Sequence, residues 1–401
     1  MGESAFIDRA IPGGTLYQTV IVSAQKNERS VMFAAPAHGM GALSASGGKG
    51  HMSTQKIYAL PVETTGWKFD GATEISFNWE YDDGSADLLN LYEKGKQQQW
   101  DTSTRIDWTQ ELFESNPMGM ADETIPIYGS PFWEKMTEKE KEWLRFNLQC
   151  HSICQFMHGE QGALICTAKI VETVPWYDAK LYASTQVVDE ARHVEVFARY
   201  LDEKLGGSYQ INAHLRMLLD DIVNDSRWDM TYLGMQIMVE GLALAAFGNM
   251  QQMTTEPLLK KLLRYVMSDE ARHVAFGVLS LQEVYKDMSD AEIKERQEFA
   301  YEASVRMRDR FMSQEVWERM GVNPRDVVPL ILRDPTREVF QQMLFAKIVP
   351  NCKKLGLLDR NDSWLRRRYE EMGVIQFENA EDTGEEYVKY ELGETLADVQ
   401  H

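Results

Sequence analysis

The hexapeptide DEARHV occurs twice in the chain, at residues 189–194 and again at residues 269–274. Each copy contains a glutamate followed three residues later by a histidine, and another glutamate lies thirty residues before the first. A constant offset of 80 residues relates the two resulting sets, which are Glu160, Glu190 and His193, and Glu240, Glu270 and His273. Carboxylates and imidazoles are ligands of transition metals, so the duplication predicts a two-metal site.

Helical periodicity predicts four long helices around these residues, at 138–173, 177–205, 228–253 and 257–287. Pro175 lies midway between Glu160 and Glu190, and the predicted turn around Thr255 lies midway between the other two glutamates. Residues equally far from the turn of an antiparallel hairpin lie side by side, here roughly 22 Å from the turn at 1.5 Å per residue. Gly206 and Gly207 are expected to end the second helix and Thr255 to cap the fourth.

Within each motif the glutamate and histidine project from one helical face, because they are three residues apart. Two hairpins packed face to face would therefore gather all six side chains. Glu240 is the only charged residue between Asp229 and Glu256, and an unpaired carboxylate on so apolar a helix is costly. A buried ion-pair network is the alternative to metals. The matched duplication favours the metal interpretation.

Composition excludes several classes of function. The chain has 401 residues and a net charge of −20, which argues against nucleic acid as a partner. No basic and apolar leader marks a secretory signal, and the four cysteines show no CxxC spacing, so we expect a cytoplasmic protein. The most apolar stretch, 230–255, contains Gln236 and Glu240 and is predicted to be a buried bundle helix, with no membrane partner.

Three regions are expected along the chain. Residues 1–85 form an irregular N-terminal extension with short strands at about 15–24 and 30–35. Residues 86–320 form the di-metal helical bundle, including a further helix from Asp290 to about Met320. Residues 321–401 form C-terminal helices, at about 337–347 and 363–372, and an acidic tail.

Over about 138–288 the sequence resembles the ferritin-like non-haem di-iron carboxylate superfamily, in particular its oxygen-activating members with the motif Asp-Glu-x-Arg-His. Similar relatives are the bacterial multicomponent monooxygenase hydroxylase subunits, the acyl-carrier-protein desaturases and the di-iron arylamine N-oxygenases. The resemblance implies an all-α protein whose core is a ferritin-like four-helix bundle, with additional helices and the N-terminal extension around it.

The subfamily stays open, because each candidate departs from the sequence at one or two positions. Ribonucleotide reductase small subunits usually have aspartate as the first ligand and a radical tyrosine where this chain has Glu160 and Phe197. The multicomponent hydroxylases carry a threonine where this chain has Leu244. The N-oxygenases add a seventh, histidine ligand at the position of Val266.

The resemblance implies two iron ions, or manganese or a mixed Mn/Fe pair, and O2 as co-substrate. One iron is assigned to the first ligand set and the other to the second, with some carboxylates bridging, and no catalytic residue is expected beyond these ligands. The implied reaction is hydroxylation or N-oxygenation of a small apolar or aromatic substrate, with electrons from a ferredoxin or flavin reductase. An acyl desaturase is the alternative enzyme, an iron-storage or radical-generating protein is the alternative class, and a homodimer is the expected assembly.

Residues around the ligands are expected to form a second layer and a substrate pocket. Asp189 and Asp269 are candidates to hold the histidines, and Arg192 and Arg272 to neutralise these aspartates, although surface salt bridges explain the arginines nearly as well. The predicted pocket is lined by neighbours on the ligand faces, with Gly277 marking its roomier side: Phe156, Ala163, Leu164, Thr167, Phe197, Gln236, Ala243, Leu244, Phe247 and Gly277.

Overall fold

The computed structural model of the protein describes residues 74–78, 81, 84–113 and 115–381, and helices make up most of this part. The strands expected near the N-terminus and the acidic C-terminal tail lie outside the described residues. The division into regions at residues 85 and 320 stays a prediction.

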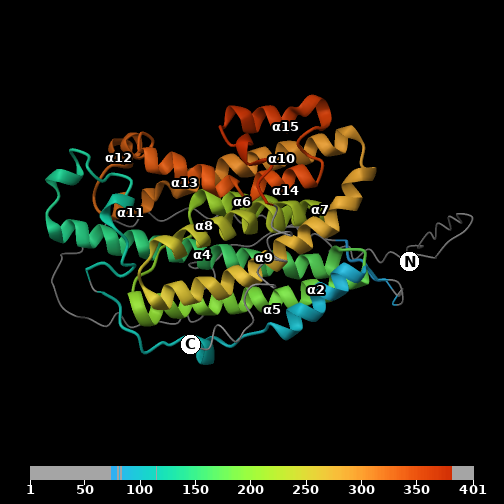
Figure 1. Ribbon diagram of the computed structural model, residues 1–401, viewed down its shortest axis with the longest axis horizontal. Helices are drawn as coiled ribbons and strands as arrows, with labels where there is room; N and C mark the ends of the chain where they lie inside the picture. Colours follow the sequence, from blue (N-terminus) through green and yellow to red (C-terminus); the bar gives the residue numbers. More distant parts are fainter. Residues whose placement is uncertain (1–73, 79–80, 82–83, 114, 382–401) are drawn as a thin grey trace, which may run out of the picture.

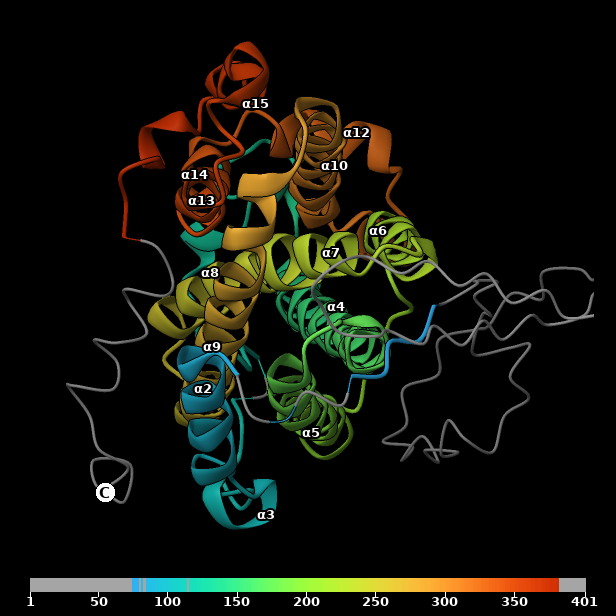
Figure 2. The same ribbon diagram turned by 90° about the vertical axis from the view of Figure 1, so that its right-hand side faces the viewer.

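Four helices form the centre of the fold, and three of them have bounds close to the predicted ones, whereas the third predicted helix is α-helical to its end only from Glu240. They are α4 (Glu138–Thr173), α5 (Tyr177–Tyr200), α8 (Glu240–Met253) and α9 (Pro257–Asp287). These helices run alongside one another (Figure 1), and the view along their axes shows α4 and α5 next to α8 and α9 (Figure 2). The two predicted hairpins therefore form one four-helix bundle.

The ends of the first hairpin follow from local chemistry. Thr137 and Glu140 make a capping box at the start of α4, in which each side chain accepts a hydrogen bond from the other residue's backbone N–H. A short π-helix, η4 (Leu201–Leu205), extends α5, and Gly206 ends it with a φ of 64°. Since glycine adopts this left-handed conformation without steric cost, Gly206 terminates the helix as predicted.

The predicted cap of α9 is wrong by one residue. The carboxylate of Glu256 accepts hydrogen bonds from the backbone nitrogens of Leu258 and Leu259 at 2.9 and 2.6 Å. Thr255 instead donates its hydroxyl to the carbonyl oxygen of Gly119 at 2.8 Å. A carboxylate satisfies two free N–H groups and interacts favourably with the positive end of the helix, which a hydroxyl does less well.

The third predicted helix, 228–253, is continuous but not regular. It comprises α7 (Trp228–Tyr232), a seven-residue π-helix η5 (Leu233–Val239) and α8. This is the one helix among the described residues that is long and apolar enough to cross a membrane, yet 89% of its apolar window is buried inside the protein. It is a core helix, as its interrupting polar residues indicated.

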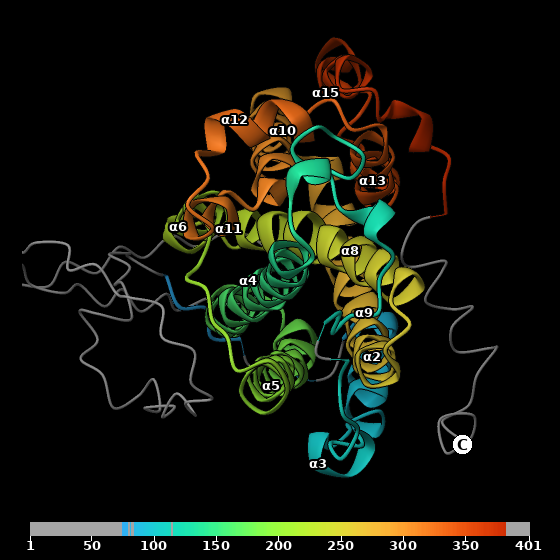
Figure 3. The same cartoon turned by 90° about the vertical axis from the view of Figure 1, so that its left-hand side faces the viewer.

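Smaller helices cover two opposite sides of the bundle. On one side lies α2 (Ala86–Gln97), which packs against α5 and α9 and is followed by α3 (Thr102–Arg105). The opposite side carries an outer layer over α4 and α8 (Figure 3). It consists of α6 (Ala213–Asn224), α10 (Asp290–Asp309), α11 (Gln314–Arg319), α12 (Pro324–Ile331), α13 (Pro335–Phe345), α14 (Ile348–Lys354) and α15 (Arg360–Glu371).

The helix predicted from Asp290 to Met320 is broken. A 3-10 turn, η6 (Arg310–Met312), follows α10, and Ser313 adopts a φ of 48° before α11 begins. Because a left-handed residue cannot continue a right-handed helix, the chain changes direction here. The other 3-10 turns are Asp122–Thr124, Trp133–Lys135 and Ile375–Phe377.

Candidate metal centre

The bundle brings together all six side chains predicted as ligands. Glu160 comes from α4, Glu190 and His193 from α5, Glu240 from the first turn of α8, and Glu270 and His273 from α9. None is more than 5% exposed. Their oxygen and nitrogen atoms form two groups suited to hold metal ions, Glu160, Glu190, His193 and Glu270, and Glu190, Glu240 and His273.

Glu190 and Glu270 each face both histidines. His193 Nδ1 lies 3.0 Å from Glu270 Oε1 and 3.5 Å from Glu190 Oε2. His273 Nδ1 lies 3.1 Å from Glu190 Oε1 and 3.6 Å from Glu270 Oε2. Each of these glutamates therefore presents one oxygen to each half of the site, which is the geometry of a bridging carboxylate.

Glu160 and Glu240 each face one of the two histidines. Glu160 Oε2 lies 3.2 Å from His193 Nδ1, and Glu240 Oε2 lies 4.0 Å from His273 Nδ1. The sequence analysis left open which carboxylates bridge. The glutamates of the two repeated motifs face both histidines, whereas the upstream glutamates each face one.

The cluster has more acceptors than donors and fits a pair of cations. Glu190 Oε2, Glu240 Oε2, both oxygens of Glu270 and His273 Nδ1 are buried without a hydrogen-bond partner. Burial and the charge of Glu270 raise the pKa of Glu160 to about 8. Burial and the charge of Glu190 raise the pKa of Glu240 well above its usual range. Divalent cations would satisfy these atoms and offset the cost of burying their charge.

The two aspartates of the motifs hold the far side of each imidazole, but they do so across the bundle. His193 Nε2 is 3.1 Å from Asp269 Oδ2, and His273 Nε2 is 3.2 Å from Asp189 Oδ2. Each histidine thus meets the aspartate of the other motif. An aspartate at this place keeps the proton on Nε2 and directs the lone pair of Nδ1 to the metal side.

The arginines of the motifs are buried and pair with these aspartates. Arg192 is 7% exposed and contacts both Asp189 and Asp269, the latter at 3.0 Å. Arg272 is fully buried and contacts the same two aspartates. The interpretation as surface salt bridges is therefore wrong, because neither guanidinium lies at the surface.

Two residues between α2 and α3 complete this layer, and the sequence analysis did not identify their role. Trp100 Nε1 donates to Asp269 Oδ2 at 2.7 Å, and Gln99 Nε2 donates to Asp189 Oδ1 at 2.8 Å. The indole of Trp100 stacks on Tyr265, with 4.8 Å between ring centroids. Nothing in the spacing of these residues relates them to the motifs, since they lie about 90 residues or more away in sequence.

Two glutamines lie beside the carboxylates. Gln186 Nε2 lies 2.9 Å from Glu190 Oε1 and 2.9 Å from Glu240 Oε1. Gln236 Nε2 donates to Gln186 Oε1 at 3.0 Å. Gln186 was missed, although its position four residues before Glu190 places it on the ligand face of α5.

Gln236 reaches this network from the π-helix η5, which ends at Val239, directly before Glu240. A π-helical turn contains an extra residue compared with an α-helical turn, and such turns occur frequently at functional sites. The π-helix changes the face on which the residues before Glu240 lie. The simple 3.6-residue period used in the sequence analysis does not capture this change.

The residues predicted to line a substrate pocket mostly fill space instead. Phe156, Phe197 and Phe247 pack on one another, with the closest ring centroids, those of Phe156 and Phe247, 4.7 Å apart. Gly277 does not mark a roomier side, because a Cβ atom there would lie 2.4 Å from Gln236 Cβ. Its lack of a side chain allows η5 to approach α9 closely.

A cavity of about 500 Å³ lies next to this aromatic cluster. Of the ten predicted pocket residues, Phe156 alone lines it within the part of the chain that the structure describes. The other nine are Ala163, Leu164, Thr167, Phe197, Gln236, Ala243, Leu244, Phe247 and Gly277. Most of the lining comes from outside the four-helix bundle, including 116–126 and 310–343, which the sequence analysis did not connect with the site.

Comparisons with known proteins agree with the chemistry of the site. The sequence profile of the family described as p-aminobenzoate N-oxygenase AurF matches residues 82–356. No curated protein sequence matches the chain.

Solved structures with limited similarity to the chain include R2-like ligand-binding oxidases. The R2-like ligand-binding oxidase with an aerobically reconstituted metal cofactor after photoconversion is 16% identical, with a TM-score of 0.45, covering 69% of this chain and 94% of that chain. Two variants of R2-like ligand-binding oxidase with an anaerobically reconstituted Mn/Fe cofactor are 18% and 17% identical, with TM-scores of 0.46 and 0.47. Each of these two alignments covers 69% of this chain, and they cover 94% and 95% of the oxidase chains, respectively.

Proposed function

The chain belongs to the p-aminobenzoate N-oxygenase AurF family, and from this premise we propose that it uses O2 at a di-iron centre to oxygenate a small apolar or aromatic substrate. Membership in this family of the ferritin-like di-iron oxygenase superfamily makes the protein an oxidoreductase with a di-metal cofactor. The observation that carries the proposal is the buried cluster in which Glu190 and Glu270 face both histidines.

In this proposal each metal would have its own glutamate and histidine. Glu160 and His193 would hold one ion, and Glu240 and His273 would hold the other. Glu190 and Glu270 would be available to both ions. When bound, a pair of iron ions supplies the electrons and the binding site that O2 needs to react with an organic molecule.

The protein's own groups prepare the site for this chemistry. Asp189 and Asp269 fix the orientation of the imidazoles, and the two arginines beside them form ion pairs with these aspartates. Gln186 donates hydrogen bonds to Glu190 and to Glu240 Oε1 and so holds the two carboxylates in place, while Glu240 keeps its other oxygen for a metal. The three packed phenylalanines exclude water from the side of the cluster that faces the cavity.

The finer assignments follow from the same proposal. Electrons come from an external ferredoxin or flavin reductase, and the protein acts in the cytoplasm, as a homodimer. Hydroxylation and N-oxygenation are both compatible with this ligand set. Val266 provides no seventh ligand at the position where the N-oxygenases are expected to have a histidine.

Oxygen consumption with defined substrates tests the proposal. The protein is loaded with iron(II) without oxygen, then mixed with O2, a chemical reductant and 4-aminobenzoate or toluene, and the products are analysed by mass spectrometry. Zinc-loaded protein is the control, since zinc occupies N and O sites but has no redox chemistry. We expect substrate-dependent O2 consumption with iron, and an oxidised amino group or a new hydroxyl group distinguishes the two reactions. Consumption that depends on iron alone and deposits iron mineral would instead indicate a storage protein.

A further inference from the structure

A group of positively charged side chains lies on the surface beside α3 and the first turns of α9. Lys260, Lys261 and Arg264 are exposed on α9, where the segment 257–268 contains no acidic residue. Arg105, at the end of α3, is half-buried. Among the residues that the structure describes, no carboxylate forms an ion pair with Arg105, Lys260 or Lys261. Together the three residues of α9 and Arg105 form a basic patch on a chain whose net charge is −20.

The two helices contribute their charges to one surface. The charges of Arg105 from α3 and Arg264 from α9 both act on Tyr265. The charge of Lys261 from α9 acts on Asp107, which follows α3 directly. The basic patch is therefore continuous between α3 and α9, although the two helices are about 150 residues apart in the sequence.

Carboxylates near the basic patch have hydrogen-bond donors of their own. Asp101 accepts a hydrogen bond from the backbone nitrogen of Ser103 at 2.7 Å. Asp107 accepts one from the hydroxyl of Thr109 at 2.6 Å, and Glu195 accepts one from a hydroxyl group of α3 at 2.6 Å. These carboxylates are held by α3 and the segments beside it, and the exposed lysines of α9 keep their charge in contact with solvent.

Beneath the basic patch, a series of direct contacts leads to the metal centre. The ring of Tyr265 stacks on Trp100, with 4.8 Å between centroids. Trp100 Nε1 donates to Asp269 Oδ2 at 2.7 Å, and the same oxygen lies 3.1 Å from His193 Nε2. A protein seated on the basic patch would therefore be separated from a ligand histidine by only a few side chains in contact.

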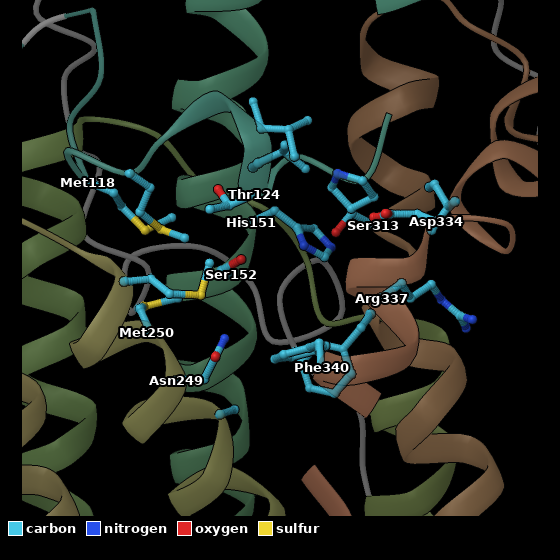
Figure 4. Close-up of a pocket in the computed structure, with 18 of the residues that line it drawn as sticks. Met118, Thr124, His151, Ser152, Asn249, Met250, Ser313, Asp334, Arg337 and Phe340 are labelled. Carbon is cyan, nitrogen blue, oxygen red and sulfur yellow. The ribbon is translucent and has the colours of Figure 1, made fainter. Parts of the chain in front are cut away.

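The cavity next to the metal centre lies on a different side of the bundle. Met250 of α8, Phe340 of α13 and Met118 line it (Figure 4), and none of the four residues of the basic patch does. The outer layer that contains α13 is opposite α3 (Figure 2). A partner bound to the basic patch would thus leave the cavity free for a small substrate.

We propose that the basic patch is the docking surface of a small acidic electron-transfer protein, which reduces the metal centre. Opposite charges on two surfaces speed the encounter and orient the partners. Weak electron-transfer complexes have small interfaces, so a patch of a few exposed charges is sufficient. The use of the electrons rests on the proposed function, whereas the docking itself does not.

The electron transfer is balanced without any covalent change. In each encounter one electron passes from the reduced iron–sulfur cluster of the carrier to one iron(III) ion of the pair. The carrier is oxidised and that ion becomes iron(II), so two encounters reduce the pair.

Cross-linking locates the docking surface without redox chemistry. The zinc-loaded full chain is treated with a carbodiimide and an acidic plant-type ferredoxin, so that carboxylates of the ferredoxin are joined to lysines in contact with them. We expect cross-links at Lys260 or Lys261, and at least about tenfold fewer of them at about 500 mM NaCl, because salt screens exposed charges. Cross-links mainly at other lysines, or none, would overturn the proposal.

Electron transfer provides the second measurement. Iron(III)-loaded protein is mixed with reduced ferredoxin in the absence of O2, and oxidation of the ferredoxin is followed by stopped-flow absorbance. Lys261→Glu should lower the second-order rate constant at least about fivefold at about 20 mM NaCl. Lys286→Glu, which changes an exposed lysine near the other end of α9, should lower it by less than about twofold. Both substitutions change the net charge equally, so equal effects would contradict the assignment.

Reduction by dithionite separates the failure of this proposal from that of the proposed function. A small reductant needs no docking surface and shows whether the metal pair accepts electrons. If dithionite fails to reduce the iron-loaded protein while cross-links form at Lys260 or Lys261, the proposed function is wrong and the docking surface stands. If dithionite reduces the protein and Lys261→Glu and Lys286→Glu affect the ferredoxin reaction equally, the docking surface is wrong and the proposed function stands.

Discussion

Replacing Glu160 by glutamine should stabilise the metal-free protein while weakening its binding of metal. Glu160 is 5% exposed, and burial and the charge of Glu270 raise its pKa from 4.5 to about 8. In the unfolded chain this carboxyl group is ionised at pH 7, so it must take up a proton when the metal-free protein folds. Glutamine requires no proton and has nearly the same shape.

The size of the gain in stability follows from the shift in the pKa of Glu160. Each pKa unit corresponds to about 1.4 kcal/mol, so folding with Glu160 costs about 3 kcal/mol at pH 7 relative to glutamine. Because the folded-state pKa is the higher one, this cost is absent below pH 4.5, grows as the pH rises, and levels off near pH 8. At pH 5 the gain should be about 0.8 kcal/mol.

Urea unfolding of chelator-treated protein, followed by circular dichroism at pH 5 and pH 7, measures both values. Glu172→Gln is the control, since Glu172 is an exposed glutamate on the same helix, and should change the free energy of unfolding by less than about 0.5 kcal/mol. Iron(II) titration should show the opposite ranking for metal affinity. A Glu160→Gln protein that is no more stable at pH 7, or whose gain is the same at both pH values, would refute the reasoning.

Two further comparisons test the roles of particular residues. Glu190→Ala should remove both metals, because this carboxylate faces both halves of the site, whereas Glu240→Ala should keep about one metal per chain. Elemental analysis after iron(II) loading measures the number of metals in each variant, and equal numbers would show that Glu190 is not shared. Gly277→Ala should destabilise the protein by about 1–3 kcal/mol in thermal unfolding, because its Cβ would lie 2.4 Å from Gln236 Cβ. Gly159→Ala, in the open interior of α4, should instead stabilise it by about 0.5–1 kcal/mol, and similar effects of both substitutions would contradict the packing argument.

The helices could be predicted because their signals are local. The periodicity of α4, the proline at 175 and the glycine at 206 act within a few residues, and the structure has the corresponding helix ends where they were expected. The break after α10 could not be predicted in this way. The sequence through Ser313 continues a helical pattern, yet Ser313 adopts a left-handed conformation that ends the helix.

The site shows the same division between local and distant effects. That a glutamate and a histidine share a helix face follows from their spacing of three residues, and the duplication repeats that relation at the second motif. The sequence therefore determined which six side chains meet. It did not determine that Glu190 and Glu270 are the shared pair, because this depends on how far each helix is rotated about its axis.

By itself the sequence also named the aspartates and arginines of the second layer, but the tertiary structure decided their partners. Asp189 meets His273 rather than its own histidine, and Trp100 reaches Asp269 from the segment between α2 and α3. The cavity likewise arises where the outer layer meets the bundle. Spacing along one helix fixes direction, whereas contacts between helices depend on crossing and rotation, which are set by the packing of the whole core.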